Sequence, residues 1–239
     1  MDALMKQWTP NLYLYRDKFI QSLQATFEMF WKAGSIAFVI GLFFGILLVV
    51  TKKDGISKNR PVYQVTNLLI NIFRSIPFVI LLIFLIPFTR ALMRTAIGVK
   101  GAIIPLVFGT VPFYTRQVEV ALSSVAPGKI EAARAMGSGT WGIIFRVYLH
   151  EAVPELIRVT TVTAISLIGL TTMAGAVGAG GIGSFAINYG QNQYNQDIVN
   201  VCVVVLLIIT FILQSFGTAL ARRTTNRSLF PKRRYGKDA

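Results

Sequence analysis

Long apolar runs separated by short polar segments dominate the chain. Three runs, 33–51, 159–196 and 198–221, contain no charged residue, and two more, 62–88 and 95–115, contain one each. A helix needs about 20 apolar residues, at 1.5 Å per residue, to cross about 30 Å of hydrocarbon. The pattern therefore predicts an all-α integral membrane protein with five transmembrane helices, at about 29–51, 64–89, 95–118, 157–183 and 197–221.

Composition and charge support this class and suggest an orientation. The chain is 54% hydrophobic and 14% charged, whereas soluble domains carry about 25% charged residues. The loops and tail of one side hold sixteen Lys and Arg, and the other side holds seven. Positively charged loops stay in the cytosol. We therefore expect the N-terminal segment (1–24) outside, and the loop at about 124–156 and the basic tail (222–239) in the cytosol, with 25–221 as the transmembrane domain.

The net charge of +14 raises the question of nucleic acid as a partner. Outside the tail the sequence has no basic module interleaved with aromatic residues, the pattern typical of nucleic-acid binding. Cationic residues beside anionic membrane lipid explain the charge instead. We expect lipid, and no nucleic acid, among the partners.

The loop between the third and fourth spans contains a polar, mixed-charge segment, KIEAARAMGSGTWGIIFRVYLHEAVP, at 129–154. Pro127 suits the first turn of a helix, and Gly137 and Gly139 favour its end. We expect Ser138 or Thr140 to cap a second, amphipathic helix, with Pro154 marking a bend into the fourth span. That helix includes Trp141, Ile144, Phe145, Tyr148 and Leu149.

A short helix of this kind could lie on lipid or contact a protein. A helix that lies on lipid is usually rich in Lys and Arg, but residues 129–136 balance two cations against Glu131. Ala132 and Ala133 keep one face small, so that the backbone of another protein can approach closely. We therefore expect this helix to contact a soluble protein partner.

The spacing within this segment resembles the EAA loop of permease subunits of ATP-binding-cassette (ABC) importers. Glu131, Ala132, Ala133 and Gly137 are followed by Val147 and Leu149 at the spacing of that motif, and His150 stands where the motif has a proline. In that family the loop docks onto a separate ATPase. The resemblance thus assigns coupling to the ATPase to Lys129, Glu131, Ala132, Ala133, Arg134, Met136 and Gly137.

Further segments are similar to the permeases of methionine importers within this binding-protein-dependent (type I) family, and the likeness covers roughly residues 25–220. They are RSIPF at 74–78, IPFTR at 86–90, Pro112-Phe113, EAARAMG at 131–137 and MAGAVGAGGIG at 173–183. The resemblance implies a homodimer with two cytosolic ATPase subunits and an extracytoplasmic binding protein, in a bacterial inner membrane. It implies no cofactor on this chain, since ATP and Mg belong to the partner ATPase.

Glycines crowd the end of the fourth span. Gly178 to Gly183 indicate a helix break, and non-helical backbone at membrane depth is buried in protein or lines a cavity. Met173, just before them, could form an apolar gate between two subunits, although packing alone explains each of these residues about as well. The candidates for the pathway or gate are Met173, Gly175, Gly178, Gly180 and Gly181.

Charged residues within the spans are few. We expect Arg74 to reach the cytosolic interface and Lys100 the outer headgroups, as long cationic side chains do near span ends. No Asp or Glu lies inside a span, whereas ion-coupled transporters usually need one there. The chain also lacks a phosphate-binding G-x-x-x-x-G-K-[ST] loop. Its energy must therefore come from a partner chain, and we do not expect an enzyme.

Two other functions remain open. The first is a permease of the same family for another amino acid or small solute. The second is a membrane enzyme or scaffold, which the residues favour less. An enzyme needs convergent acid, base or metal ligands, and the chain has one histidine, His150, and one cysteine, Cys202.

Overall fold

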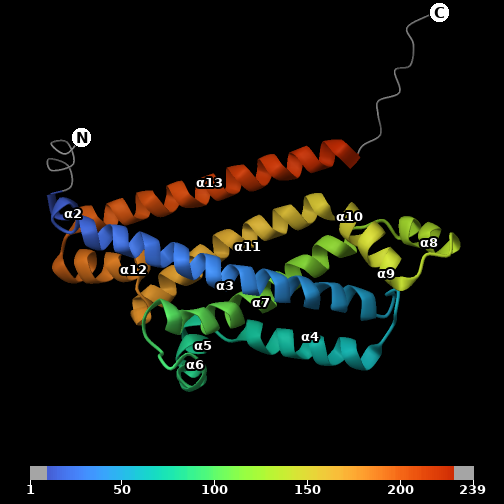
Figure 1. The fold of residues 1–239 in the computed structure, drawn as a ribbon, viewed down its shortest axis with the longest axis horizontal. Helices are drawn as coiled ribbons and strands as arrows, with labels where there is room; N and C mark the ends of the chain where they lie inside the picture. Colours follow the sequence, from blue (N-terminus) through green and yellow to red (C-terminus); the bar gives the residue numbers. More distant parts are fainter. Residues whose placement is uncertain (1–9, 229–239) are drawn as a thin grey trace, which may run out of the picture.

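The computed structural model describes residues 10–228 as a bundle of long helices that run side by side (Figure 1). The long elements and their neighbours are α3 (Arg16–Thr51), α4 (Arg60–Ser75), α5 (Phe78–Phe84), α6 (Ile86–Met93), α7 (Gly98–Ser123), α11 (Val153–Ala174) and α13 (Gln196–Ser228). The shorter elements are α2 (Pro10–Leu14), α8 (Pro127–Ala135), α9 (Thr140–Gly142), η1 (Ile143–Tyr148), α10 (Leu149–Glu151), η2 (Gly175–Ala179), α12 (Gly181–Phe185), η3 (Ala186–Gly190) and η4 (Gln191–Gln193).

The predicted fold class is confirmed. In the described part of the chain, four helices are long and apolar enough to span a membrane, and α4 with α5 brings the number to five if this bent pair is one span. In Figure 1, α8 and α9 lie at one end of the bundle and α2 and α12 at the other. We refer to these as the α8 end and the α12 end.

The second span is not the straight helix over 64–89 that the apolar run predicted. The chain turns by 102° between α4 and α5, at Ile76 and Pro77, which have extended backbone conformations. Proline disfavours helical geometry in the residue before it. Only α4 therefore runs along the bundle, and α5 and α6 form a separate short arm (Figure 1).

The first and third spans form the closest helix pair. Gly41 and Gly45 of α3 face α7, where an added Cβ on Gly41 would lie 2.7 Å from the Tyr114 ring and one on Gly45 would overlap Val118. Small residues four positions apart allow two membrane helices to approach in this way. The α3 and α7 backbones thus form the centre against which the other helices pack.

The fourth span breaks where the glycines predicted it. Gly178, Gly180 and Gly181 all have positive φ values, and α12 follows directly. The break is fastened to α3, because the Ile182 backbone N–H donates to the buried Thr26 hydroxyl at 2.9 Å. The predicted span over 157–183 therefore ends earlier, and its last residues belong to α12.

The last span packs on α11 at one face and is otherwise largely exposed. At the α12 end, Asp197 at the start of α13 accepts hydrogen bonds from the backbone and side chain of Asn11, at 3.1 and 3.0 Å. The helix continues to Ser228, past the predicted end at 221. Most of the predicted basic tail, from residue 229 onward, lies outside the described residues, as do residues 1–9 of the N-terminal segment.

Candidate functional site

The predicted coupling helix is α8. Its sequence explains its limits: Pro127 occupies the first turn, and Gly137 follows its end with φ +79°. The Gly137 and Ser138 backbone N–H groups donate to the carbonyls of Arg134 and Ala133, at 2.9 and 3.0 Å. This is the left-handed glycine stop that the sequence predicted.

The expected cap of the second helix is wrong. Gly139, not Ser138 or Thr140, precedes α9, and no side chain caps that helix. The extended backbone of Gly139 leads the chain from the Gly137 stop into α9.

One apolar core joins α8 to the membrane helices. Ala133 is buried in a cluster with Ile143 and Tyr148 of η1, and the cluster continues through Val118 of α7 to Val159 of α11. Because closely packed interiors transmit displacement, a force applied to α8 reaches both α7 and α11. Burial raises the pKa of the Tyr148 phenol above its ordinary value, although the charge of Arg134 opposes this, so the side chain packs as a neutral group.

Two of the predicted coupling residues contact their own chain. Lys129 pairs with Glu151 at 2.5 Å, and Arg134 donates to the Gly55 carbonyl at 3.5 Å in the turn between α3 and α4. Glu131, Ala132 and Met136 are exposed instead. The seven residues therefore have different roles. Ala133 packs α8 against the core, Lys129 and Arg134 bind other parts of the same chain, and Gly137 ends the helix. The remaining three are open to a partner.

Two aromatic residues extend the exposed surface of α8. Trp141 and Phe145 are 73% and 61% exposed, and their rings stack with centroids 6.1 Å apart. With Met136, which is 78% exposed, they border an open cleft at the turn. We call these three side chains the apolar docking patch. The sequence analysis named both aromatics as members of the second helix but assigned neither to a face, so their exposure was not predicted.

The pathway candidates on the fourth span fall into two groups. Gly175 and Gly181 are buried: an added Cβ on Gly175 would lie 2.7 Å from the Gly180 carbonyl, and one on Gly181 would lie 2.7 Å from the Thr26 hydroxyl. Met173 is 49% exposed, and Gly178 is also exposed. Gly180 is half-buried at the break itself. Gly175 and Gly181 thus serve packing, and of the five candidates only Met173 and Gly178 are exposed.

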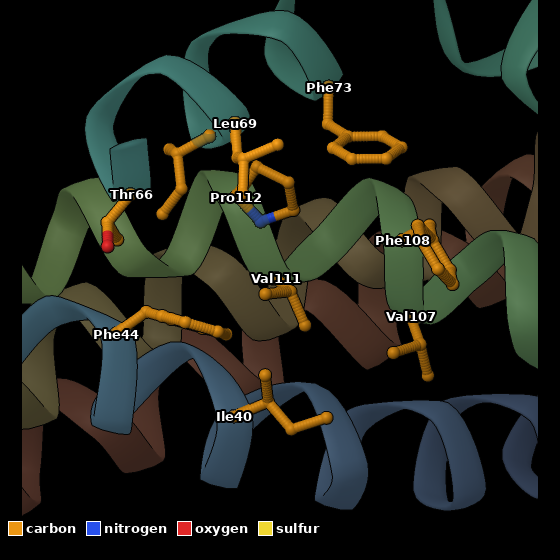
Figure 2. Close-up of a pocket in the computed structure, with 10 residues that line it drawn as sticks. Ile40, Phe44, Thr66, Leu69, Phe73, Val107, Phe108, Val111 and Pro112 are labelled. Carbon is orange, nitrogen blue, oxygen red and sulfur yellow. The ribbon is translucent and has the colours of Figure 1, made fainter. Parts of the chain in front are cut away.

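A cavity of about 260 Å³ lies between α3, α4 and α7 (Figure 2). Its lining is apolar apart from Thr66, and Phe44, Phe73 and Phe108 are among the side chains that border it. An amino acid carries two charges, and nothing in this lining complements them. The lining of this cavity therefore suits a hydrocarbon chain better than a polar solute.

Beside this cavity a polar cluster holds α4 to α7. Arg116 of α7 pairs with Glu119 at 2.6 Å and donates to the amide oxygens of Asn71, at 2.8 Å, and Asn67. The side chains of Arg116 and Glu119 are only 18% and 17% exposed. This cluster was not predicted, although the i, i+4 spacing of the two asparagines is visible in the sequence.

Known proteins with similar sequences were found by comparison. Residues 37–226 match the family model for the binding-protein-dependent transport system inner membrane component. A probable D-methionine transport system permease protein, MetI, of Vibrio cholerae is 39% identical over 214 residues, which cover 90% of this chain and 95% of the relative.

Two further matches agree. The methionine import system permease protein MetP of Bacillus subtilis is 49% identical over 72% of this chain and 77% of its own length. A solved structure of the MetNI methionine ABC transporter, in an inward-facing conformation, superposes with a TM-score of 0.85 at 41% identity, over 88% of this chain and 97% of that one. The chain therefore belongs to the family of binding-protein-dependent transport system inner membrane components.

Proposed function

We propose that this chain is the permease subunit of an ABC importer for methionine, as its relatives' names suggest. The observation that carries the coupling role is the docking patch, an apolar surface exposed at one end of a membrane bundle and anchored through Ala133 to the core. Exposed apolar clusters of this kind typically mark interaction sites with protein or membrane. The partner on this patch is a cytosolic ATPase.

The active complex contains two copies of this chain, two ATPase subunits and an extracytoplasmic binding protein. ATP and its Mg²⁺ are bound by the ATPases, so hydrolysis does not take place on this chain. The α8 end faces the cytosol and the N-terminus lies outside, in keeping with the distribution of Lys and Arg. Met173 and Gly178 face the second copy or the pathway.

The mechanism follows from the way α8 is packed. When the ATPases close on ATP, they displace the docking patch and, with it, Glu131 and Ala132 on the exposed face of α8. Ala133 transmits the movement to η1 and thence to α7 and α11. The lining helices then change their arrangement, and the pathway opens toward the binding protein.

The test is ATP-dependent uptake of radiolabelled methionine into vesicles that hold the permease, its ATPase and its binding protein. Trp141→Ala and Glu131→Arg are expected to lose uptake and co-purification of the ATPase together. Truncation of a central aromatic contact typically costs about 2 kcal/mol or more in binding. Trp31→Ala is the matched control, because Trp31 is 74% exposed on α3 and lies outside the patch.

The outcomes separate the alternatives. Unchanged uptake in Trp141→Ala and Glu131→Arg would contradict the docking assignment. Intact ATPase binding without methionine uptake would keep the ABC permease and point to another amino acid or small solute. Neither ATPase binding nor uptake by the wild type would favour a membrane scaffold.

A further inference from the structure

Helix α4 carries a polar stripe of which only Asn67 and Asn71 have a role described above, as acceptors for Arg116. Arg60, Gln64, Asn67, Asn71 and Arg74 recur at spacings of four and three residues, and Ser75 follows directly. At about 100° per residue they fall, with Ser75, within an arc of about 100° on the helix. The packing face with Thr66, Ile70 and Phe73 borders one side of this arc, and exposed Val65, Leu68 and Ile72 border the other.

Arg74 lies far from the cytosolic interface that its side chain was expected to reach. The turn before Arg60 sits at the α8 end, since Gly55 in it contacts Arg134. Arg74 lies fourteen positions after Arg60 on α4, a rise of about 21 Å in a hydrocarbon layer of about 30 Å. That is too far for the side chain to reach back to the α8 end. Helix side chains lean toward the helix N-terminus, so it does not reach the opposite surface either.

Arg74 has no counter-charge within the described chain. It is exposed, and no hydrogen bond or ion pair involves its side chain. A charged residue at this depth faces the bundle interior or a water-filled cavity, with a partner for its charge. The Arg74 guanidinium is therefore not expected to face lipid tails, because the energetic cost would be high.

A second copy of the chain could not supply the missing carboxylate. Among the described residues, only Glu28 and Glu119 lie within long helices beyond the first turn. Glu28 already pairs with Lys32 at 2.5 Å and Glu119 with Arg116 at 2.6 Å. Neither this chain nor a second copy thus leaves a free carboxylate within the long helices for Arg74, and an anion from solution is the remaining kind of partner.

The backbone beside Arg74 also indicates an aqueous environment. Directly after Ser75 the chain leaves the helix and turns by 102° into α5. The end of α4 therefore leaves backbone carbonyls without helical partners. Such backbone at membrane depth is tolerated where it is buried in protein or lines an aqueous cavity. Because Asn71, Arg74 and Ser75 are exposed here, a cavity fits this site better.

We propose that the polar stripe of α4 lines the translocation pathway and that Arg74 binds the carboxylate of the amino acid that passes. Arginine presents a planar set of donors that matches a carboxylate in two parallel hydrogen bonds. Gln64 and the amide N–H groups of Asn67 and Asn71 continue the polar wall toward the α8 end. This inference rests on the proposed import of an amino acid and adds the site at which the solute is held.

Cysteine accessibility tests the placement without relying on transport. In a Cys202→Ala background, Ser75→Cys and Ile72→Cys are compared in membrane vesicles that contain the permease with its ATPase. Both positions are exposed and three residues apart, but only Ser75 belongs to the stripe. We expect an anionic methanethiosulfonate reagent to label Ser75→Cys and to leave Ile72→Cys unlabelled.

The charge of Arg74 should also select the reagent. Arg74 should raise the local anion concentration on the order of tenfold, so that the anionic reagent reacts faster than a cationic one of equal size. Arg74→Gln should abolish this preference and Arg74→Lys should keep it. Equal labelling of the two cysteines, absence of labelling at Ser75→Cys, or a preference that survives Arg74→Gln would overturn the placement.

Ligand protection tests the carboxylate. Saturating methionine should slow the labelling of Ser75→Cys, whereas methioninol, which has a hydroxyl in place of the carboxylate, should not. Labelling that neither compound slows, together with no effect of other amino acids, would overturn the ligand assignment. Protection by a different amino acid but not by methionine would keep the role of Arg74 and contradict the methionine substrate in the proposed function.

Discussion

Gly137 and Gly139 flank the turn between α8 and α9 and differ in one respect, the backbone angle. Gly137 has φ +79° and Gly139 has φ −70°, and an added Cβ would meet nothing within 4 Å at either position. Both positions therefore have room for a side chain, but only Gly137 has a backbone conformation that disfavours one. The pair separates backbone strain from steric bulk at a surface that we assign to the ATPase.

Gly137→Ala should weaken ATPase binding and Gly139→Ala should not. A side chain in the left-handed region costs about 1–2 kcal/mol, which corresponds to a factor of about 5–30 in an equilibrium constant. Co-purification at several ATPase concentrations measures the change, and Gly137→Asn should recover part of it. An equal loss for both alanine variants would show that any side chain in the turn interferes, whatever its backbone angle.

At this scale the sequence predicted backbone better than side-chain direction. The stop at Gly137 and the break at Gly178 follow from the intrinsic freedom of glycine, so both could be predicted. The sequence placed Trp141 and Phe145 on an amphipathic helix without assigning either to a face. Regular periodicity would not have placed Phe145, because it lies in η1, which has π-helical geometry. The burial of Gly175 depends on α12 folding back against it, which is information that no local pattern contains.

At the scale of elements, the attachment of α4 depends on a small polar cluster. Arg116 joins α7 to α4 through Asn67 and Asn71, and its ion pair with Glu119 is largely shielded from solvent. Another Arg–Glu pair with the same three-residue separation, Arg158 and Glu155 on α11, is much more exposed, at 57% and 36%. The two pairs therefore differ mainly in burial.

Arg116→Leu should destabilise the protein by about 2–3 kcal/mol, because hydrogen bonds to a charged group are lost and buried partners are left unpaired. Arg158→Leu should cost no more than about 1 kcal/mol, as exposed ion pairs do. Denaturation in detergent micelles, followed by tryptophan fluorescence, measures both. Similar losses for the two variants would contradict a special role for the cluster.

Elements were predicted from apolar length alone, and this accounts for the error in the second span. The run over 62–88 is long enough to cross a membrane, so length gave one helix. The extended geometry imposed at Ile76 by Pro77 divides it. With the break recognised and α4 bounded at Ser75, the polar spacing from Arg60 to Arg74 becomes visible in the sequence as a stripe.

At the scale of the whole molecule, the two ends of the bundle should face opposite sides of the membrane. Ser138 is exposed at the α8 end, and Tyr194, before the start of α13, is 93% exposed at the α12 end. Cys202 is buried and should contribute little background labelling. A cysteine at either position thus reports one side of the membrane.

A membrane-impermeant maleimide should label Tyr194→Cys in intact spheroplasts and Ser138→Cys only after permeabilisation. This result is expected because the loops at the α8 end carry the excess of Lys and Arg. Labelling in the reverse order would contradict the proposed orientation and, with it, docking of a cytosolic ATPase on α8.

The length of α3 has a mechanical consequence. Its 36 residues measure about 54 Å at 1.5 Å per residue, against a hydrocarbon layer of about 30 Å. Tilt alone cannot absorb the excess, because membrane helices lean by at most about 40°. The first turns of α3 therefore project beyond the membrane at the α12 end, together with α2 and the Asn11 contact to α13.

Helix α3 is thus a single long arm, with most of its length in the membrane and its first turns beyond it. If it pivots by about 10° at its Thr51 end, its far end moves by about 9 Å, given the rise of 1.5 Å per residue. Thr26 sits on this arm and holds the N–H of Ile182, so the glycine break of the fourth span travels with it. A small rotation beside the α8 end is thereby amplified into a large displacement at the opposite end.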